Sequence, residues 1–139
     1  YGFLDEAMRP AAAMNRSAAI EFVYDDVGNL VEKREYSADG GLLDHPVLPA
    51  IERFDYDERG NLLRKSSLSA DREPHPDRYG VCSIEYDYDS FGRIIGQRNL
   101  DEDGELTEGD GGWATSVWII DDSTAEVSQR TYDTEGNEL

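Results

Sequence analysis

The sequence predicts an all-β protein, in which tandem β-hairpins form one antiparallel sheet that is a single layer thick and either open or curling. Two observations predict this fold. Aromatic, acidic and glycine residues recur at a constant interval of 32 residues, which gives about four units in a chain of 139 residues. Within each unit, apolar and polar residues alternate between the turn signals, as they do in half-buried strands.

The 32-residue interval holds for several kinds of residue and needs no gap. The tyrosine position holds Tyr24, Tyr56, Tyr88 and, in the fourth unit, Ile120, and the next position holds Asp25, Asp57, Asp89 and Asp121. The glycine position holds Gly28, Gly60, Gly92 and, in the fourth unit, Thr124. Such self-similarity is typical of repeat proteins, in which each unit buries its apolar surface against its neighbours.

We expect one repeat domain over residues 1–139. Its parts are 1–17, the end of a preceding unit with a connector; 18–49, 50–81 and 82–113, three repeats; and 114–139, a partial fourth repeat. The alanine-rich stretch 10–15 favours a single helical turn. The parent protein is expected to be a longer array with a total number of repeats that the sequence leaves open.

Each unit predicts one hairpin, and the first unit illustrates the pattern. Residues 20–24 alternate as a strand, and a turn over 25–29 follows, in which Asp25 caps the backbone and Gly28 supplies a positive φ. A second strand occupies residues 30–36, and a second turn at 38–40 ends it. An irregular connector then leads to the next unit.

Alternation along the strands assigns side chains to two faces. One face should carry the pairs Phe22 with Tyr24, Phe54 with Tyr56, Tyr86 with Tyr88, and Trp118 with Ile120. Neighbouring hairpins should bury these rings against one another. The opposite face should place Glu21, Arg53, Asp55, Glu85 and Asp87 in water. Val117 and Ile119 break this pattern in the fourth unit, so its outer face should be covered or form an interface.

An excess of acids dominates the composition. The chain has 31 Asp and Glu against 13 Lys and Arg, a net charge of −18. Binding nucleic acid needs Lys and Arg to displace counterions, so this balance argues against such a partner. The absence of a run of about 18 apolar residues argues against membrane insertion. A single cysteine excludes an intrachain disulfide and a multi-cysteine metal cluster.

The three residues that most often carry chemistry show no catalytic pattern. Cys82 aligns with Ala50 and Ala114 in the other units, which predicts a packed thiol. His45 and His75 lie in connectors at non-equivalent repeat positions, which favours solvated loop residues over ligands or bases. We therefore predict no enzyme, no catalytic, cofactor-binding or metal-binding residue, and no cofactor.

The recurring aspartates are predicted to cap turns. Equivalent turns of stacked hairpins lie about 10 Å apart, whereas the ligands of one calcium ion lie within about 5 Å of each other, so one ion cannot bridge successive turns. A calcium ion could bind only within one loop, for which 101–105 is the best candidate, and the sequence leaves this question open. The acidic surface would also discourage aggregation between exposed sheet edges.

The motifs Tyr24-Asp25-x-x-Gly28-Asn29-Leu30, Tyr56-Asp57-x-x-Gly60-Asn61-Leu62 and Tyr88-Asp89-x-x-Gly92-Arg93-Ile94 resemble the tyrosine–aspartate (YD) repeats of Rhs-type bacterial proteins. This resemblance implies an extended, curling sheet of hairpins in a bacterial surface, secreted or toxin-delivery protein, and a scaffold role. An extracellular or cell-surface location is implied by the resemblance alone. The spacing is longer than in typical Rhs repeats, and the segment linked to their self-cleavage has no counterpart, so only the hairpin module is inferred.

Two functions are compatible with these patterns. The first is a non-enzymatic hairpin repeat that acts as a scaffold or protein–protein interaction surface, with a protein or neighbouring repeats as partners. A homo-oligomer through the aromatic face or the edge strands belongs to the same hypothesis. The alternative is a module that binds a carbohydrate or another ligand through exposed tyrosines, and its distinguishing sign would be aromatic rings exposed on one face.

Overall fold

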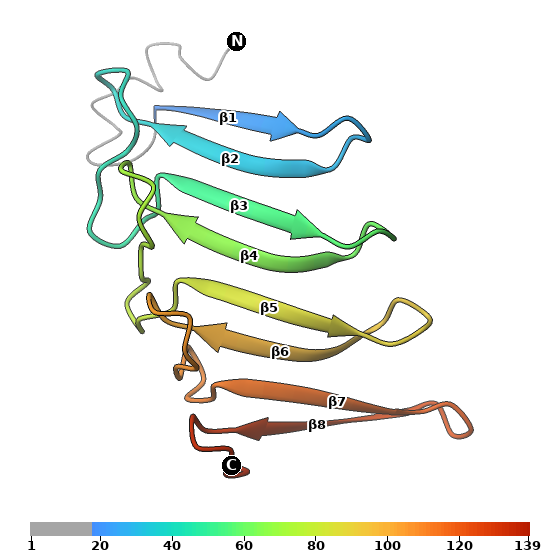
Figure 1. The fold of residues 1–139 in the computed structure, drawn as a ribbon. Helices are drawn as coiled ribbons and strands as arrows, with labels where there is room; N and C mark the ends of the chain where they lie inside the picture. Colours follow the sequence, from blue (N-terminus) through green and yellow to red (C-terminus); the bar gives the residue numbers. More distant parts are fainter. Residues whose placement is uncertain (1–17) are drawn as a thin grey trace.

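The structure is a computed structural model that describes residues 18–139. Eight strands follow one another through a single sheet in chain order, and each is antiparallel to the next. Figure 1 shows them as one layer, with β1 and β8 at opposite edges. The prediction of an all-β open sheet of hairpins is therefore confirmed. The helical turn expected at 10–15 lies outside the described residues.

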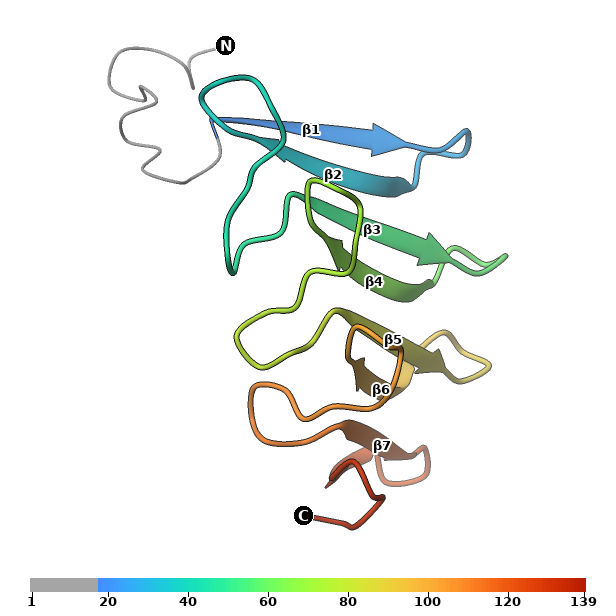
Figure 2. The same cartoon turned by 60° about the vertical axis from the view of Figure 1, so that its left-hand side comes forward.

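The strands form four hairpins at the predicted interval. Hairpin 1 is β1 (Ala19–Tyr24) and β2 (Leu30–Tyr36), hairpin 2 is β3 (Ile51–Tyr56) and β4 (Leu62–Leu68), hairpin 3 is β5 (Ser83–Tyr88) and β6 (Ile94–Leu100), and hairpin 4 is β7 (Thr115–Asp121) and β8 (Glu126–Tyr132). Tight turns close the hairpins at one end of the sheet, and irregular connectors join them at the other end (Figures 1 and 2).

The tight turns have the chemistry that the sequence predicts. In hairpin 1, Oδ1 of Asp25 accepts hydrogen bonds from the backbone N–H groups of Val27 (3.0 Å) and Asn29 (2.9 Å). The φ angle of Gly28 is 92°, a conformation that costs glycine little because it has no Cβ. Asp57 and Asp89 repeat the cap in hairpins 2 and 3. The predicted capping role of these aspartates is confirmed.

The turn of hairpin 4 is built differently. Hairpins 1 to 3 have an irregularity in register just before the turn, whereas hairpin 4 pairs regularly up to Asp121 and Glu126. Its positive φ lies at Ala125 (61°) rather than at Thr124, where the other units have glycine. A β-branched residue resists positive φ, so the strained position moves to the alanine. Asp121 still caps the turn through the N–H of Ser123 (2.9 Å).

The buried residues lie at the connector end of the sheet, not along the aromatic pairs. The connector after β2 folds back, and the N–H of Leu43 donates to the carbonyl of Glu35 (2.9 Å). Leu43 then packs against Ala50 and Ile51, and the exposed fractions of the three residues are 2%, 1% and 0%. Apolar residues at the connector end are also buried further along the array, namely Val81, Cys82, Leu100 and Ala114.

The expectation that hairpins bury their aromatic rows is wrong for hairpin 1 and holds only in part elsewhere. Phe22 is 51% exposed and Tyr24 is 59% exposed. The rings of the later units, Phe54, Tyr56, Tyr86, Tyr88 and Trp118, are half-buried. A single layer has no second sheet to cover this face, so each ring is shielded by its in-sheet neighbours alone. Ile119 is 47% exposed, so the described residues do not provide the cover that was expected for the outer face of the fourth unit.

Pairing within a hairpin is more extensive than pairing between hairpins. Six residue pairs join β3 to β4, whereas three join β2 to β3. Contacts outside the backbone ladder must therefore help to hold consecutive hairpins together. Within residues 18–139, no helix has the length and apolarity needed to cross a membrane.

Candidate functional site

Consecutive hairpins are joined by a tyrosine contact that recurs with the repeat. The hydroxyl of Tyr56 donates to the carbonyl oxygen of Leu30 in the preceding hairpin (2.7 Å), and Tyr88 bonds to Leu62 with the same distance. Burial raises the pKa of both phenols, so both hydroxyls remain protonated donors at neutral pH. The motif tyrosine therefore holds one hairpin against the one before it. This bond, Tyr56 to Leu30 or Tyr88 to Leu62, is called the joint between hairpins.

Each edge of the sheet has one side of a contact that joins consecutive hairpins elsewhere in the described array. Tyr24 occupies the same repeat position as Tyr56 and Tyr88, but it is 59% exposed, and its hydroxyl bonds to no group in residues 18–139. At the other edge, Leu139 is equivalent to Leu43, and its N–H makes the same fold-back bond, to Thr131 (2.9 Å). Leu43 is 2% exposed and Leu139 is 63% exposed, because no hairpin of the described chain follows it.

The face opposite the aromatic rings is the charged face, which carries Glu21, Arg53, Asp55, Glu85, Asp87 and their cross-strand partners. Cross-strand pairing places Asp55, Arg64, Glu85 and Arg98 opposite one another on β3, β4, β5 and β6. Glu85 lies 3.4 Å from Nε of Arg98 and 3.9 Å from a terminal nitrogen of Arg64. Opposite charges on neighbouring strands stabilise the sheet modestly and limit the effect of the net negative charge.

Glu32 on this face is paired with two arginines. It accepts from Nε of Arg34 (2.6 Å) and from Arg72 (3.1 Å), and its side chain is only 13% exposed. Burial raises the pKa of this carboxyl, but the hydrogen bonds from the two arginines outweigh it and leave the pKa lowered. Arg72 has a φ of 65°, at a repeat position where the other three units have Gly40, Gly104 and Gly136.

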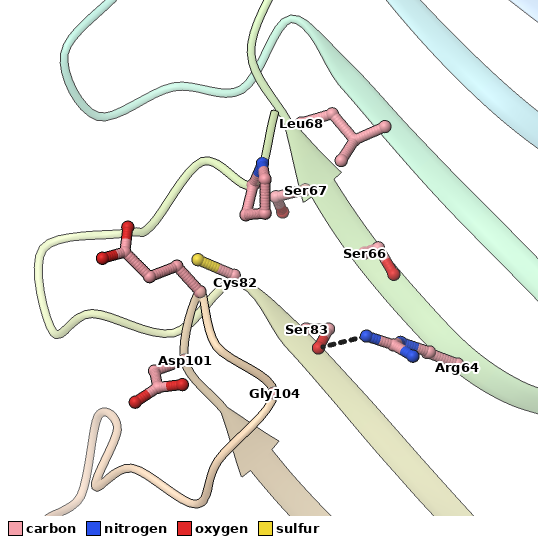
Figure 3. Close-up of a pocket in the computed structure, with 10 residues that line it drawn as sticks. Arg64, Ser66, Ser67, Leu68, Cys82, Ser83, Asp101 and Gly104 are labelled. Atoms are coloured by element: carbon pink, nitrogen blue, oxygen red, sulfur yellow. Dashed lines mark hydrogen bonds between the residues drawn. The ribbon is translucent and has the colours of Figure 1, made fainter. Parts of the chain in front are cut away.

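Two adjoining pockets lie on the charged face of hairpin 2. One is about 250 Å³ and is lined by Arg53, Asp55, Arg64, Ser66 and Leu68. The other is about 110 Å³, shares Arg64, Ser66 and Leu68 with the first, and extends under the connectors to Pro74, Cys82 and Asp101. Figure 3 shows Arg64 reaching across to Ser83 on β5, where a terminal nitrogen lies 3.3 Å from the hydroxyl oxygen. The pockets were not predicted from the sequence.

Cys82 is buried, as its alignment with two alanines predicts. Its exposed fraction is 5%, and its N–H pairs with the carbonyl of Leu100 (2.8 Å). Burial raises the pKa of the thiol, and the carboxylates of Glu102 and Asp101 raise it further. A protonated, buried thiol is a poor nucleophile, which fits the prediction of a packing residue.

The two histidines lie in connectors, as expected, and their side chains are half-buried rather than fully solvated. Nδ1 of His45 accepts from the N–H groups of Val47 (3.0 Å) and Leu48 (2.9 Å), which makes it the cap of a connector turn. His75 lies in the next connector, and its shielded Nε2 has no hydrogen-bond partner in the part of the chain that the structure describes. Asp77, not His75, occupies the position equivalent to His45 and caps the turn there.

The acidic loop 101–105, the candidate for calcium, also uses its first carboxylate as a turn cap. Oδ1 of Asp101 accepts from the N–H groups of Asp103 (2.9 Å) and Glu105 (3.0 Å). No group of three or more His, Cys, Asp or Glu side chains in the described chain is arranged to hold a metal ion. Asp133 caps the equivalent loop after β8 in the same way, so this geometry belongs to the repeat.

The fold and these contacts define a tandem β-hairpin repeat protein with a half-covered aromatic face, a charged face and two sheet edges, at β1 and β8. No protein-family model matches the sequence, and no curated protein matches it. The resemblance to YD repeats remains a prediction that depends on the tyrosine–aspartate–glycine motif alone.

Proposed function

We propose that this chain is a non-enzymatic β-hairpin repeat module of a larger bacterial surface or secreted protein, and that it serves as a scaffold with protein–protein contacts at its sheet edges. The observation that carries the proposal is the joint between hairpins. Tyr56 and Tyr88 each lock onto the preceding hairpin, while Tyr24 offers the same hydroxyl at the β1 edge. Neighbouring repeats or a second copy are the partners that fit this edge.

The C-terminal edge supports the same proposal. Leu43 shows that the leucine of a folded-back connector belongs against the first strand of the next hairpin. Leu139 holds that position after β8, and the equivalent first-strand positions at the other edge are Ala18 and Ala19. The two edges are therefore complementary in the manner of consecutive hairpins, which is the property that a scaffold built by repetition requires.

The alternative, binding of a carbohydrate or another ligand on the aromatic face, has one specific observation in its favour. Phe22 and Tyr24 are exposed together at one end of that face. Exposed aromatic rings can stack on sugars or on partner side chains. The later tyrosines Tyr56 and Tyr88 use their hydroxyls in the joints, so hairpin 1 is the best location for such a ligand.

Solution mass across a concentration series tests the proposal. We expect species heavier than the 15.6 kDa monomer at high concentration, favoured by salt that screens the net charge of −18. Leu139→Asp should weaken this association, and Phe22→Ala on the aromatic face should not. A monomer at every concentration and salt would contradict an interaction surface at the edges, and a larger effect of Phe22→Ala would favour the aromatic face.

A further inference from the structure

Hairpin 2 breaks a charge pattern that hairpins 1 and 3 share. Across hairpin 1, Glu21 lies opposite Arg34, and the two side chains are 3.3 Å apart. Across hairpin 3, Glu85 lies opposite Arg98 at 3.4 Å. The equivalent pair in hairpin 2 is Arg53 opposite Ser66. A guanidinium therefore stands where hairpins 1 and 3 have a carboxylate, and a short hydroxyl replaces the long arginine.

This exchange leaves both a space and an uncompensated positive charge. The space is the pocket of about 250 Å³ that Arg53, Arg64 and Ser66 line. Arg53 forms no ion pair with any residue in 18–139. Glu32, which lies directly opposite Arg53, is already bound by two other arginines, Arg34 and Arg72.

Arg64, the second arginine of the pocket, is also incompletely satisfied. Its contact with Glu85 is long, at 3.9 Å, and Glu85 is shared with Arg98. Its Nε is shielded from solvent and has no hydrogen-bond partner among residues 18–139, an arrangement that costs free energy in a charged donor. Asp55 lies opposite Arg64 but does not come within ion-pair distance of it. The pocket therefore has two arginines and one carboxylate.

We propose that this pocket binds a small organic carboxylate between Arg53 and Arg64. Guanidinium groups recognise carboxylates through paired, charge-assisted hydrogen bonds, and the hydroxyl of Ser66 can donate a further one. A carboxylate is favoured because Glu21 and Glu85 supply that group at the equivalent place in hairpins 1 and 3. This site depends on hairpin 2 alone and is independent of the proposed scaffold function.

Nuclear magnetic resonance titration tests the site, with acetate as the probe and acetamide as its uncharged isostere. Acetate should produce saturable shifts at the side-chain N–H signals of Arg53 and Arg64 and at the amides of Ser66 and Ser83. Acetamide should produce none. An equal response to acetamide, or no saturable shift with acetate, would overturn the proposal. Tighter binding of inorganic phosphate than of acetate would overturn the carboxylate class.

Two variants locate the site. The double exchange Arg53→Glu with Ser66→Arg restores the pair found in hairpins 1 and 3, so it fills the pocket with residues that this fold already accommodates. It should weaken acetate binding at least tenfold. Because the new glutamate faces Glu32 on β2, the melting temperature is measured first to establish that the variant is folded. Arg53→Gln, at an exposed position, provides a second loss variant that retains the fold. Unchanged affinity in both folded variants would show that acetate binds elsewhere.

Removal of the competing carboxylate provides the opposite test. Asp55 lines the pocket and repels an incoming anion, so Asp55→Asn should strengthen acetate binding severalfold. Asp26→Asn, at an exposed acid in the turn of hairpin 1, is the matched control because it changes the net charge equally. Equal strengthening by both variants would indicate a response to total charge and would overturn a defined site at hairpin 2.

Discussion

The hydroxyl of Tyr88 lies 2.7 Å from the carbonyl oxygen of Leu62, to which it donates a hydrogen bond across 26 residues of sequence. Tyr56 repeats this bond to Leu30 with the same distance and separation. The motif tyrosine is thus a connecting residue between hairpins as well as an apolar strand residue. Hairpin 4 has Ile120 at this position and cannot make the bond, but Arg93 bridges its turn to Asp122 instead (2.8 Å).

Tyr88→Phe removes this hydroxyl and keeps the ring. We expect a loss of about 1 kcal/mol in the free energy of unfolding, the usual contribution of one hydrogen bond, measured as a lower urea midpoint. Tyr24→Phe is the matched control, because its hydroxyl has no partner in residues 18–139. An equal effect of the two substitutions would show that the joint does not stabilise the array.

The position of the core leads to a second prediction. Ile51 is fully buried at the connector end, so Ile51→Ala should cost about 2–5 kcal/mol in unfolding free energy. Phe22→Ala removes a larger side chain that is 51% exposed, and it should cost only about 1 kcal/mol. Urea unfolding of both variants checks the order, and a larger loss for Phe22→Ala would place the core on the aromatic face.

The positive φ of Ala125 leads to a third prediction. A left-handed conformation costs an L-residue about 1 kcal/mol relative to glycine, so Ala125→Gly should raise the stability of hairpin 4 by about that amount. Gly60→Ala makes the reverse change at a φ of 86°, with no neighbour within 4 Å of the new Cβ, and should lower stability similarly. Melting temperatures that shift in the same direction would contradict the turn assignments.

Acid sensitivity provides a fourth prediction. The hydroxyl and N–H of Ser123 lower the pKa of Asp121 in the folded protein, so the unfolded chain takes up this proton first as the pH falls. The stability that this cap provides is complete above about pH 4 and is lost as the pH falls through the folded pKa. Asp121→Asn keeps an accepting oxygen but does not titrate.

We therefore expect Asp121→Asn to lose less stability than the unmodified chain between about pH 5 and pH 3, as measured by urea unfolding at each pH. Asp26→Asn is the control, because its carboxylate accepts no hydrogen bond from the described residues. Parallel stability curves for Asp121→Asn and the unmodified chain would show that this turn cap does not contribute to acid sensitivity.

Much of the fold could be predicted because its determinants are local. The 32-residue interval located all eight strands, and the Asp–Gly chemistry of the turns depends on residues at most four positions apart. The small residues aligned with Cys82 correctly indicated a buried position. The turn of hairpin 4 was harder to predict. Thr124 replaces the glycine of the other units, and the positive φ lies at Ala125 instead, a shift that the 32-residue interval does not specify.

The candidate site was less predictable, although one signal was available. Comparison of the units at one position finds Arg34, Arg98 and Arg130 but Ser66, and this exception marks the pocket. The sequence does not show that Arg72 bonds to Glu32, which lies 40 residues earlier in the chain. This bond makes Glu32 unavailable as an ion-pair partner for Arg53. The site therefore depends on contacts between residues that are distant in the chain.

The sequence by itself determined the repeat, the hairpins, the capping aspartates and the division into two faces, because strand alternation and turn chemistry are properties of short segments. Only the tertiary structure decided where the core lies and which charges are paired. Burial requires a second element to cover a surface, and in this single-layer sheet the cover comes from connectors that fold back, as Leu43 does over Ile51. The tertiary structure also places the tyrosine hydroxyls on the preceding hairpin, because a joint between hairpins exists only once they are stacked.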